Sequence, residues 1–291
     1  MEILEEFSLR EWTAPPPPEA VSRAAAALEG GKILYAPELR FALTESERRF
    51  LSPGYLDGSA KNISFRPSTG ELGGTAAQGA EREELTAMVR RFYAEATALV
   101  RALCPAYVGK IVPGLTSFRP AEIAGRASSW RKDDTRLHVD AFPSRPSHGN
   151  RILRVFANVN DSAPRVWRAG EPFAQAARTL LPRVHAPFPG SLAALALFKV
   201  TKGKRTLYDH YMLGLHDAMK ADLRYQSEAP QSRIEFPAGT SWACYTDLVS
   251  HGAISGQHVF EQTFYLPVAG MVDPALSPLR VLEGMLGKPL V

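Results

Sequence analysis

The segment RIEFPAGTSWACYTDLVSHGAISGQHVFEQTFYL, from Arg233 to Leu266, decides the fold class of this chain. Three of its runs favour strands, Arg233–Phe236, Ser241–Thr246 and Val259–Leu266, and Pro, Gly, Asp and Ser residues separate them. The connections are short, and strands do not alternate with helices as they do in parallel sheets. The segment therefore predicts an antiparallel sandwich or barrel.

The same texture begins near Leu115, with further strands expected at Thr135–Phe142 and Ile152–Val159. Helical patterns interrupt it near Glu171–Leu181 and Leu207–Tyr225. We expect a mainly β, α+β chain whose core, about residues 115–268, is a β-barrel or jelly roll with inserted helices.

The first part of the chain has a more helical pattern. Helices are expected at Glu19–Leu28 and Glu81–Leu103, a short strand at Lys32–Tyr35, and a capping box at Thr44–Glu47 that opens another short helix. We expect a single domain over residues 1–291, with a helical part at about 1–105 packed on the β core and a C-terminal tail at 269–291.

The composition excludes several classes of protein. The longest apolar run, Leu192–Phe198, has seven residues, whereas a membrane-spanning helix needs roughly 20. The start, MEILEEFSLREW, is acidic where a signal peptide is basic, so we expect a cytoplasmic protein. Cys104 and Cys244 are too few for a disulfide scaffold or a cysteine zinc site. Phosphate-loop and dinucleotide-binding motifs are absent from the sequence.

Basic residues are concentrated in one part of the chain. The net charge is +4, made of −4 over residues 1–60 and +8 over residues 61–291. Ten basic residues lie between Arg119 and Arg168, against five acidic ones. This clustering favours an anionic partner, and the alternative is a solvated basic face. Nucleic acid is not expected, because no helix carries a basic stripe and no nucleic-acid-binding motif occurs.

The run TRLHVDAFP, Thr135–Pro143, is the best candidate for chemistry. On a strand, alternate side chains share a face, so His138 and Asp140 can chelate one metal ion. With seven histidines in the chain this spacing is weak evidence by itself, and a merely polar strand face remains the alternative. His251, at an expected strand-to-turn junction, would complete the two-histidine, one-carboxylate triad of non-haem Fe(II) oxygenases. The other candidates for the third position are His148, His185, His210, His216 and His258.

Longer strings carry a family resemblance. SFRPAEIAGRASSWRKDDTRLHVDAFPSRP, GNRILRVFANVN, PRVWRAGEPF, LHDAMKADLRYQ and FPAGTSWACYTDLVSHGAISGQHVFEQTFYLP resemble the Kdo hydroxylase family of Fe(II)/2-oxoglutarate dioxygenases, as do GKILYAPELRFAL and KNISF. The resemblance covers about residues 28–268. It implies a double-stranded β-helix, Fe(II) held by His138, Asp140 and His251, and 2-oxoglutarate and O₂ as cosubstrates.

The resemblance also implies a substrate and a place of action. Family members hydroxylate C3 of a 3-deoxy-D-manno-oct-2-ulosonic acid (Kdo) residue of Kdo-lipid A, in the lipopolysaccharide inner core, to give Ko. A cytoplasmic enzyme would meet this glycolipid at the inner membrane, where peripheral contact with the cytoplasmic leaflet is expected. The alternatives are a 2-oxoglutarate oxygenase of another substrate and a non-catalytic jelly-roll sugar-binding protein.

The cosubstrate and the substrate both need cations. Many 2-oxoglutarate oxygenases place an arginine about ten residues after the distal histidine, but VFEQTFYL has neither Arg nor Lys. Arg154 shares a strand face with Ile152 and Phe156 and is the expected partner of the distal carboxylate, with Arg151 next and a structural ion pair as the alternative. Arginines flanking the metal strand are expected to hold substrate carboxylates or phosphates: Arg119, Arg126, Arg131 and Arg145.

Overall fold

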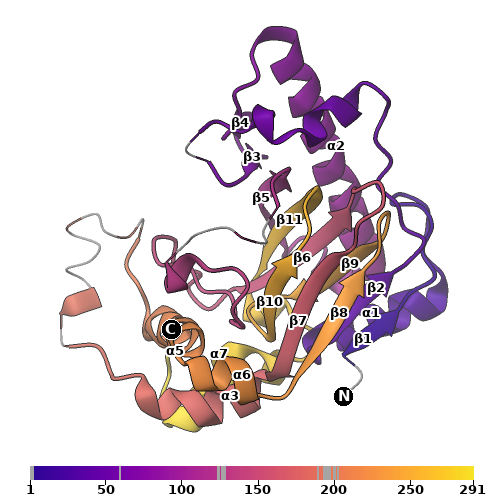
Figure 1. The fold of residues 1–291 in the computed structure, drawn as a ribbon. Helices are drawn as coiled ribbons and strands as arrows, with labels where there is room; N and C mark the ends of the chain where they lie inside the picture. Colours follow the sequence, from indigo (N-terminus) through magenta and orange to yellow (C-terminus); the bar gives the residue numbers. More distant parts are fainter. Residues whose placement is uncertain are drawn as a thin grey trace.

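Two β-sheets form the core of the chain in a computed structural model that describes residues 3–58, 60–122, 125, 129–188, 190–192, 198, 201 and 203–291. The large sheet has eight strands in the order β1-β2-β9-β6-β11-β5-β3-β4, and the small sheet has three in the order β10-β7-β8 (Figure 1). The large-sheet strands are β1 (Leu4–Glu6), β2 (Ile33–Ala36), β3 (Ile63–Arg66), β4 (Glu71–Gly73), β5 (Val112–Arg119), β6 (Arg151–Asn158), β9 (Ser241–Tyr245) and β11 (Val259–Leu266). The small-sheet strands are β7 (Arg165–Pro172), β8 (Gln231–Phe236) and β10 (Val249–Ser255).

The chain passes back and forth between the two sheets. β5, β6, β9 and β11 belong to the large sheet and pair antiparallel, while β7, β8 and β10 form the small sheet. His138 adds one more antiparallel bridge beside β10, so the segment around it extends the small sheet. This arrangement confirms the predicted jelly-roll core.

Aromatic side chains fill the space between the sheets. Trp242 of β9 stacks on Phe236 of β8 with ring centroids 4.0 Å apart, and it meets Trp167 of β7 edge-on at 5.7 Å. Phe156 of β6 contacts both tryptophans. Because β-strands alternate their side chains, each of these strands places one row of apolar residues in this interior.

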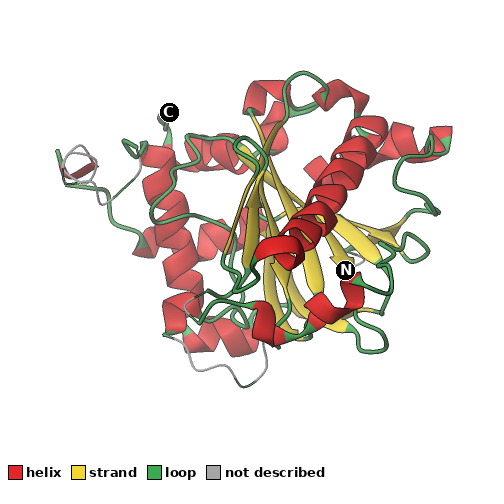
Figure 2. Ribbon diagram, turned by 90° about the horizontal axis from the view of Figure 1, so that it is seen from above, coloured by secondary structure: helices red, strands yellow, loops and turns green. Residues whose placement is uncertain are grey.

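The helices lie on the outside of the sheets. α1 (Pro18–Glu29) and α2 (Gly79–Leu103) contact strands of the large sheet, and α2 buries Leu85, Val89 and Phe92 at helical spacing. Figure 2 shows helices across one face of this sheet. The others gather beside the end of the small sheet: α3 (Phe173–Leu180), α5 (Leu207–Ala221), α6 (Leu223–Glu228) and α7 (Pro278–Leu286) (Figure 1). Short 3₁₀ helices occur at Glu47–Leu51, Pro53–Tyr55, Pro105–Tyr107, Trp130–Lys132, Leu181–Arg183, Val268–Gly270 and Pro274–Leu276.

The structure departs from the sequence predictions at several places. The expected strand Thr135–Phe142 forms only the single bridge at His138, and His251 lies within β10 rather than at a strand end. The expected helix Leu207–Tyr225 breaks at Asp222, whose carboxylate caps α6. The C-terminal tail contains α7, which buries Leu282. In the part of the chain that the structure describes, no helix is long and apolar enough to cross a membrane.

Candidate metal centre

His138 and His251 face each other across one pair of backbone hydrogen bonds. The amide of His138 donates to the carbonyl of His251 at 2.9 Å, and the amide of His251 donates to the carbonyl of His138 at 2.8 Å. Residues directly opposite in an antiparallel pair project their side chains to the same side, and the two ring centroids are 4.7 Å apart. Asp140 follows two residues after His138 on the same face, and one ligand atom from each of the three lies within 4.8 Å of the others.

Backbone contacts orient both imidazole rings. Nδ1 of His138 lies 2.7 Å from the carbonyl of Arg136, and Nδ1 of His251 lies 2.8 Å from the carbonyl of Val249. Each Nδ1–H therefore donates to a carbonyl two residues earlier in the chain and leaves Nε2 free to bind a metal ion. Burial lowers the pKa of both histidines, which favours the neutral form that coordinates metal.

Arginine side chains hold the carboxylate of the triad. Nη2 of Arg154 lies 3.0 Å from Oδ2 of Asp140, and its Nη1 lies 3.0 Å from Oε1 of Glu261. Arg119 binds the other oxygen of Glu261 at 2.8 Å. Burial alone would raise the pKa of Asp140, but the neighbouring guanidinium of Arg154 is the main influence that outweighs it and keeps that pKa well below its usual value. Asp140 is therefore an anion, the form in which a carboxyl group binds a metal ion.

The triad opens into a cavity of about 340 Å³, here called the catalytic cavity. Trp167 lies nearly flat on His251, with ring centroids 5.1 Å apart. Seven cationic side chains line the cavity, namely Lys61, Arg119, Arg131, Lys132, Arg154, Arg165 and Lys220. Only three acidic ones do, Asp134, Asp140 and Glu261. This excess of positive charge suits anionic ligands.

Arg165 and Lys220 line the cavity although the sequence indicated no role for them, and His216 lines it although it was considered only as an alternative metal ligand. Arg165 is 4% exposed, donates from Nη1 to the carbonyl of Gly256 at 2.7 Å, and has no carboxylate within 4.0 Å among the described residues. Burial and the neighbouring Arg119 lower the pKa of Arg165 to about 9. His216 and Lys220 come from α5. No local sequence pattern indicates Arg165 or Lys220, because long-range packing brings them to the metal centre.

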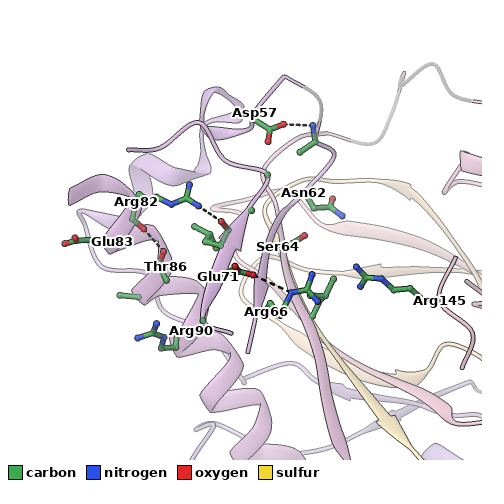
Figure 3. A pocket seen from close by; sticks show the side chains of 17 residues that line it. Asp57, Asn62, Ser64, Arg66, Glu71, Arg82, Glu83, Thr86, Arg90 and Arg145 are labelled. Carbon is green, nitrogen blue, oxygen red and sulfur yellow. Dashed lines mark hydrogen bonds and ion pairs between the residues drawn. The ribbon is translucent and has the colours of Figure 1, made fainter. Parts of the chain in front are cut away.

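The other arginines expected at the site occupy different places. Arg119 and Arg131 line the catalytic cavity. Arg145 lines a larger neighbouring hollow of about 940 Å³, where it faces Arg66 of β3 (Figure 3). Arg126 lies outside the described residues. Arg151 is buried with Asp247, at 2.7 Å, and does not line the catalytic cavity.

The competing histidines make other contacts. The ring of His148 is hydrogen-bonded to the carbonyl of Lys204, and that of His210 to the carbonyl of His185. His258 lies in the turn between β10 and β11 beside Asn160. His216 reaches the catalytic cavity, but its Nδ1 binds Asp217 at 3.0 Å. Within the described residues, only His138, Asp140 and His251 are grouped closely enough to hold a metal ion.

Comparisons with known proteins agree with this geometry. The family model described as 3-deoxy-D-manno-oct-2-ulosonic acid (Kdo) hydroxylase matches residues 11–289. No curated protein gave a significant match. A crystal structure of the Kdo hydroxylase KdoO, a non-haem Fe(II) α-ketoglutarate-dependent dioxygenase, in complex with α-ketoglutarate (2-oxoglutarate) and Fe(III), is 45% identical with a TM-score of 0.96. The alignment covers 99% of this chain and 97% of that one.

Two further structures of KdoO show the same likeness. The complex with cobalt(II) is 46% identical with a TM-score of 0.97, and the complex with succinate and Fe(III) is 44% identical with a TM-score of 0.96. Each alignment again covers 99% of this chain and 97% of the other. With a family model that spans almost the whole sequence, these likenesses show that the chain belongs to the Kdo hydroxylase family of non-haem Fe(II)/2-oxoglutarate dioxygenases.

Proposed function

We propose that this chain hydroxylates C3 of a Kdo residue of Kdo-lipid A, with Fe(II) at His138, Asp140 and His251 and with 2-oxoglutarate and O₂ as cosubstrates. The observation that carries the proposal is the two-histidine, one-carboxylate group at the wall of a cationic cavity. Such a set fills three positions around an iron ion and leaves the rest for cosubstrates. The chemistry that iron supplies there is O₂ activation, coupled to oxidative decarboxylation of 2-oxoglutarate.

The chain's own part in the reaction is to position the reactants. Hydrogen bonds to backbone carbonyl groups orient the two imidazole rings. Arg154 forms an ion pair with Oδ2 of Asp140, and the other oxygen, Oδ1, lies 3.9 Å from Nε2 of His138. Trp167 packs on both His251 and Trp242, so the cavity wall behind His251 is aromatic and offers water no hydrogen-bonding partner other than the ring nitrogens.

The distal carboxylate of 2-oxoglutarate needs a cation in the catalytic cavity. Arg154 is the residue that the sequence indicates, although two carboxylates already contact it. Arg165 is a second candidate, because its guanidinium is buried without a carboxylate partner among the described residues and a buried charge is costly until it is paired. The KM for 2-oxoglutarate in Arg154→Met and Arg165→Met, measured beside the affinity for Co(II), separates them. Replacing the residue that binds the cosubstrate should raise the KM for 2-oxoglutarate by about 30-fold or more. A residue that only orients Asp140 should weaken metal binding instead.

The remaining arginines suit the anionic groups of the substrate. We propose that Arg119 and Arg131 act inside the catalytic cavity, and that Arg145 and Arg66 receive phosphate or carboxylate groups farther from the reacting sugar. The two hollows adjoin along the chain, because Lys61 lines one and Asn62 the other. Arg126 remains a proposed substrate contact. A basic surface of this kind also suits peripheral contact with the anionic cytoplasmic leaflet of the inner membrane.

Two measurements test the proposed function. Purified protein with Fe(II) and 2-oxoglutarate should release succinate faster when Kdo-lipid A is added. Mass spectrometry of lipopolysaccharide from a host that expresses the chain should show an inner core heavier by one oxygen atom. Succinate release that does not increase on addition of Kdo-lipid A would indicate another substrate. The absence of any iron-dependent succinate release would indicate a sugar-binding protein without catalysis.

A further inference from the structure

Lys220 is a buried cation at the catalytic cavity, and among the described residues no carboxylate forms an ion pair with it; Asp134, Asp140 and Asp133 act on it only from farther away. It lies in the last turn of α5, and only 2% of its surface is exposed. Its Nζ donates to the carbonyl of Arg131 at 3.0 Å. Among the described residues, no carboxylate oxygen lies within 4.0 Å of this nitrogen. An ammonium group has three donors, so two remain available.

This arrangement costs stability in the absence of a ligand. Burial lowers the pKa of Lys220, as expected for an ammonium group that has lost much of its water. A lysine that served only packing could be replaced by an apolar side chain of the same length at a gain in stability. A buried lysine without an ion pair therefore indicates a site that is completed by an anion from outside the chain.

The position of Lys220 points at the substrate rather than at the distal end of 2-oxoglutarate. α5 belongs to the inserted helices between β7 and β8, whereas Arg154 and Arg165 project from the core strands β6 and β7. His216 lies one helical turn before Lys220 and also lines the catalytic cavity, with its ring 5.3 Å from that of His138. The α5 face with His216 and Lys220 thus forms the wall of the cavity beside the first metal ligand.

Kdo carries its own carboxylate close to the carbon that is hydroxylated. C1 is the carboxylate carbon, C2 is bonded to it, and C3 is the next atom, so C3 is only two bonds from the charged group. A cation that fixes C1 beside the metal centre leaves C3 little freedom of position. Positioning of this kind contributes to rate as well as to binding.

We infer that Lys220 binds the C1 carboxylate of the Kdo unit and so selects C3 as the carbon that faces the metal centre; this inference rests on the proposed function. The ligand class is a 2-ulosonic acid with a free carboxylate. Lys220 is a substrate-binding residue and leaves the cosubstrate to the arginines of the core strands.

The test compares two substrates and two variants. Wild type, Lys220→Met and Lys220→Arg are assayed with Kdo-lipid A and with the same glycolipid carrying a C1 carboxamide. Wild type should prefer the acid in kcat/KM by about 30-fold or more, the size expected when one partner of a buried charge pair is lost. Lys220→Met should lose most of this preference, Lys220→Arg should keep part of it, and the KM for 2-oxoglutarate should change little in both.

Lys288→Met is the matched control. Lys288 is exposed and follows α7 near the end of the chain. Its ammonium group lies over the ring of Tyr211, which belongs to α5 as Lys220 does, but Lys288 does not line the catalytic cavity. It should leave the preference for the acid intact. The melting temperature adds a readout that separates binding from structure, because Lys220→Met should melt at or above the wild-type temperature if the lysine serves a ligand.

The remaining outcomes are distinct. An undiminished preference for the acid in Lys220→Met, or a rise in the KM for 2-oxoglutarate alone, would overturn the inference. A lower melting temperature with equal losses on both substrates would make Lys220 a structural residue. If wild type neither binds nor hydroxylates Kdo-lipid A, the proposed function fails, and the assignment of Lys220 fails with it.

Discussion

At the scale of single residues, the three metal ligands contribute little to the stability of the barrel, which depends on its apolar core. His138, Asp140 and His251 sit on a framework closed by Trp167, Trp242 and their neighbours. Replacing any ligand with Ala should abolish Co(II) binding and Kdo-dependent succinate release, while the circular dichroism spectrum stays that of the folded protein. His258→Ala should keep both Co(II) binding and succinate release, because His258 lies in a turn away from the three metal ligands. Near-normal turnover in His251→Ala with loss in His258→Ala would reverse this assignment.

Arg151 illustrates the opposite case, an arginine that serves the fold. Its side chain is fully buried, with Nε 2.7 Å from Asp247 and the guanidinium over the ring of Tyr245. Breaking a buried pair from one side leaves a charge behind, at a cost of about 3–5 kcal/mol. Arg151→Met should therefore lower the free energy of unfolding in urea by that amount and leave the KM for 2-oxoglutarate unchanged. The double variant Arg151→Met/Asp247→Asn should recover part of the loss, and a large rise in KM would place Arg151 in the site after all.

At the scale of elements, the close approach of β10 to the segment that carries His138 keeps the two histidines in register. A Cβ atom added to Gly252 would lie 2.7 Å from the carbonyl oxygen of Thr135, and backbone cannot move aside cheaply. Gly252→Ala should push the strand of His251 away from that of His138 and weaken Co(II) binding by about tenfold or more, although no ligand is removed. Calorimetric titration with Co(II) measures this.

Gly284→Ala in α7 is the control for that experiment. The added methyl group meets no atom within 4 Å, and alanine favours a helix over glycine by about 1 kcal/mol. It should bind Co(II) as wild type does and unfold at a slightly higher urea concentration. Equal metal affinity in the two glycine variants would show that β10 and the His138 segment tolerate separation.

The sequence predicted the features that leave a pattern within a short segment, and it missed those that depend on contacts between distant segments. Alternation in TRLHVDAFP placed His138 and Asp140 on one face, and helical spacing located α2 within two residues. β7 was not predicted, because Arg165–Pro172 contains two arginines, a glycine and a glutamate whose burial depends on the facing sheet. The pairing of Glu261 with Arg119 and Arg154, and the approach of Lys220 to the metal centre, join residues that are far apart in the chain. Contacts of that kind leave no local pattern.

At the scale of the whole molecule, positive charge is arranged in two adjoining hollows, the catalytic cavity and the larger hollow beside it. The catalytic cavity holds the buried cations Arg165 and Lys220 and, nearer the solvent, the exposed Arg131 and Lys132. At the larger hollow, Arg66 is exposed and Arg145 is half-buried (Figure 3). Salt shortens the range of interactions between exposed charges to about 8 Å at 0.15 M and 3 Å at 1 M, and it affects buried pairs much less. A ligand group held by the buried cations should therefore respond less to ionic strength than one held by Arg66 and Arg145.

The KM for Kdo-lipid A should rise with added NaCl, because its outer anionic groups meet the exposed Arg66 and the half-buried Arg145. The KM for 2-oxoglutarate should rise much less, because its candidate partners Arg154 and Arg165 are nearly or fully buried. Arg66→Gln/Arg145→Gln should raise the KM for Kdo-lipid A at low salt and flatten its dependence on salt. The control is Arg101→Gln/Arg178→Gln, which removes two exposed charges that line neither hollow and should keep the wild-type slope. A wild-type KM for Kdo-lipid A that stays constant from low to high salt would remove the larger hollow from substrate binding. A control variant that flattens the slope equally would show that the effect belongs to the net charge of the molecule.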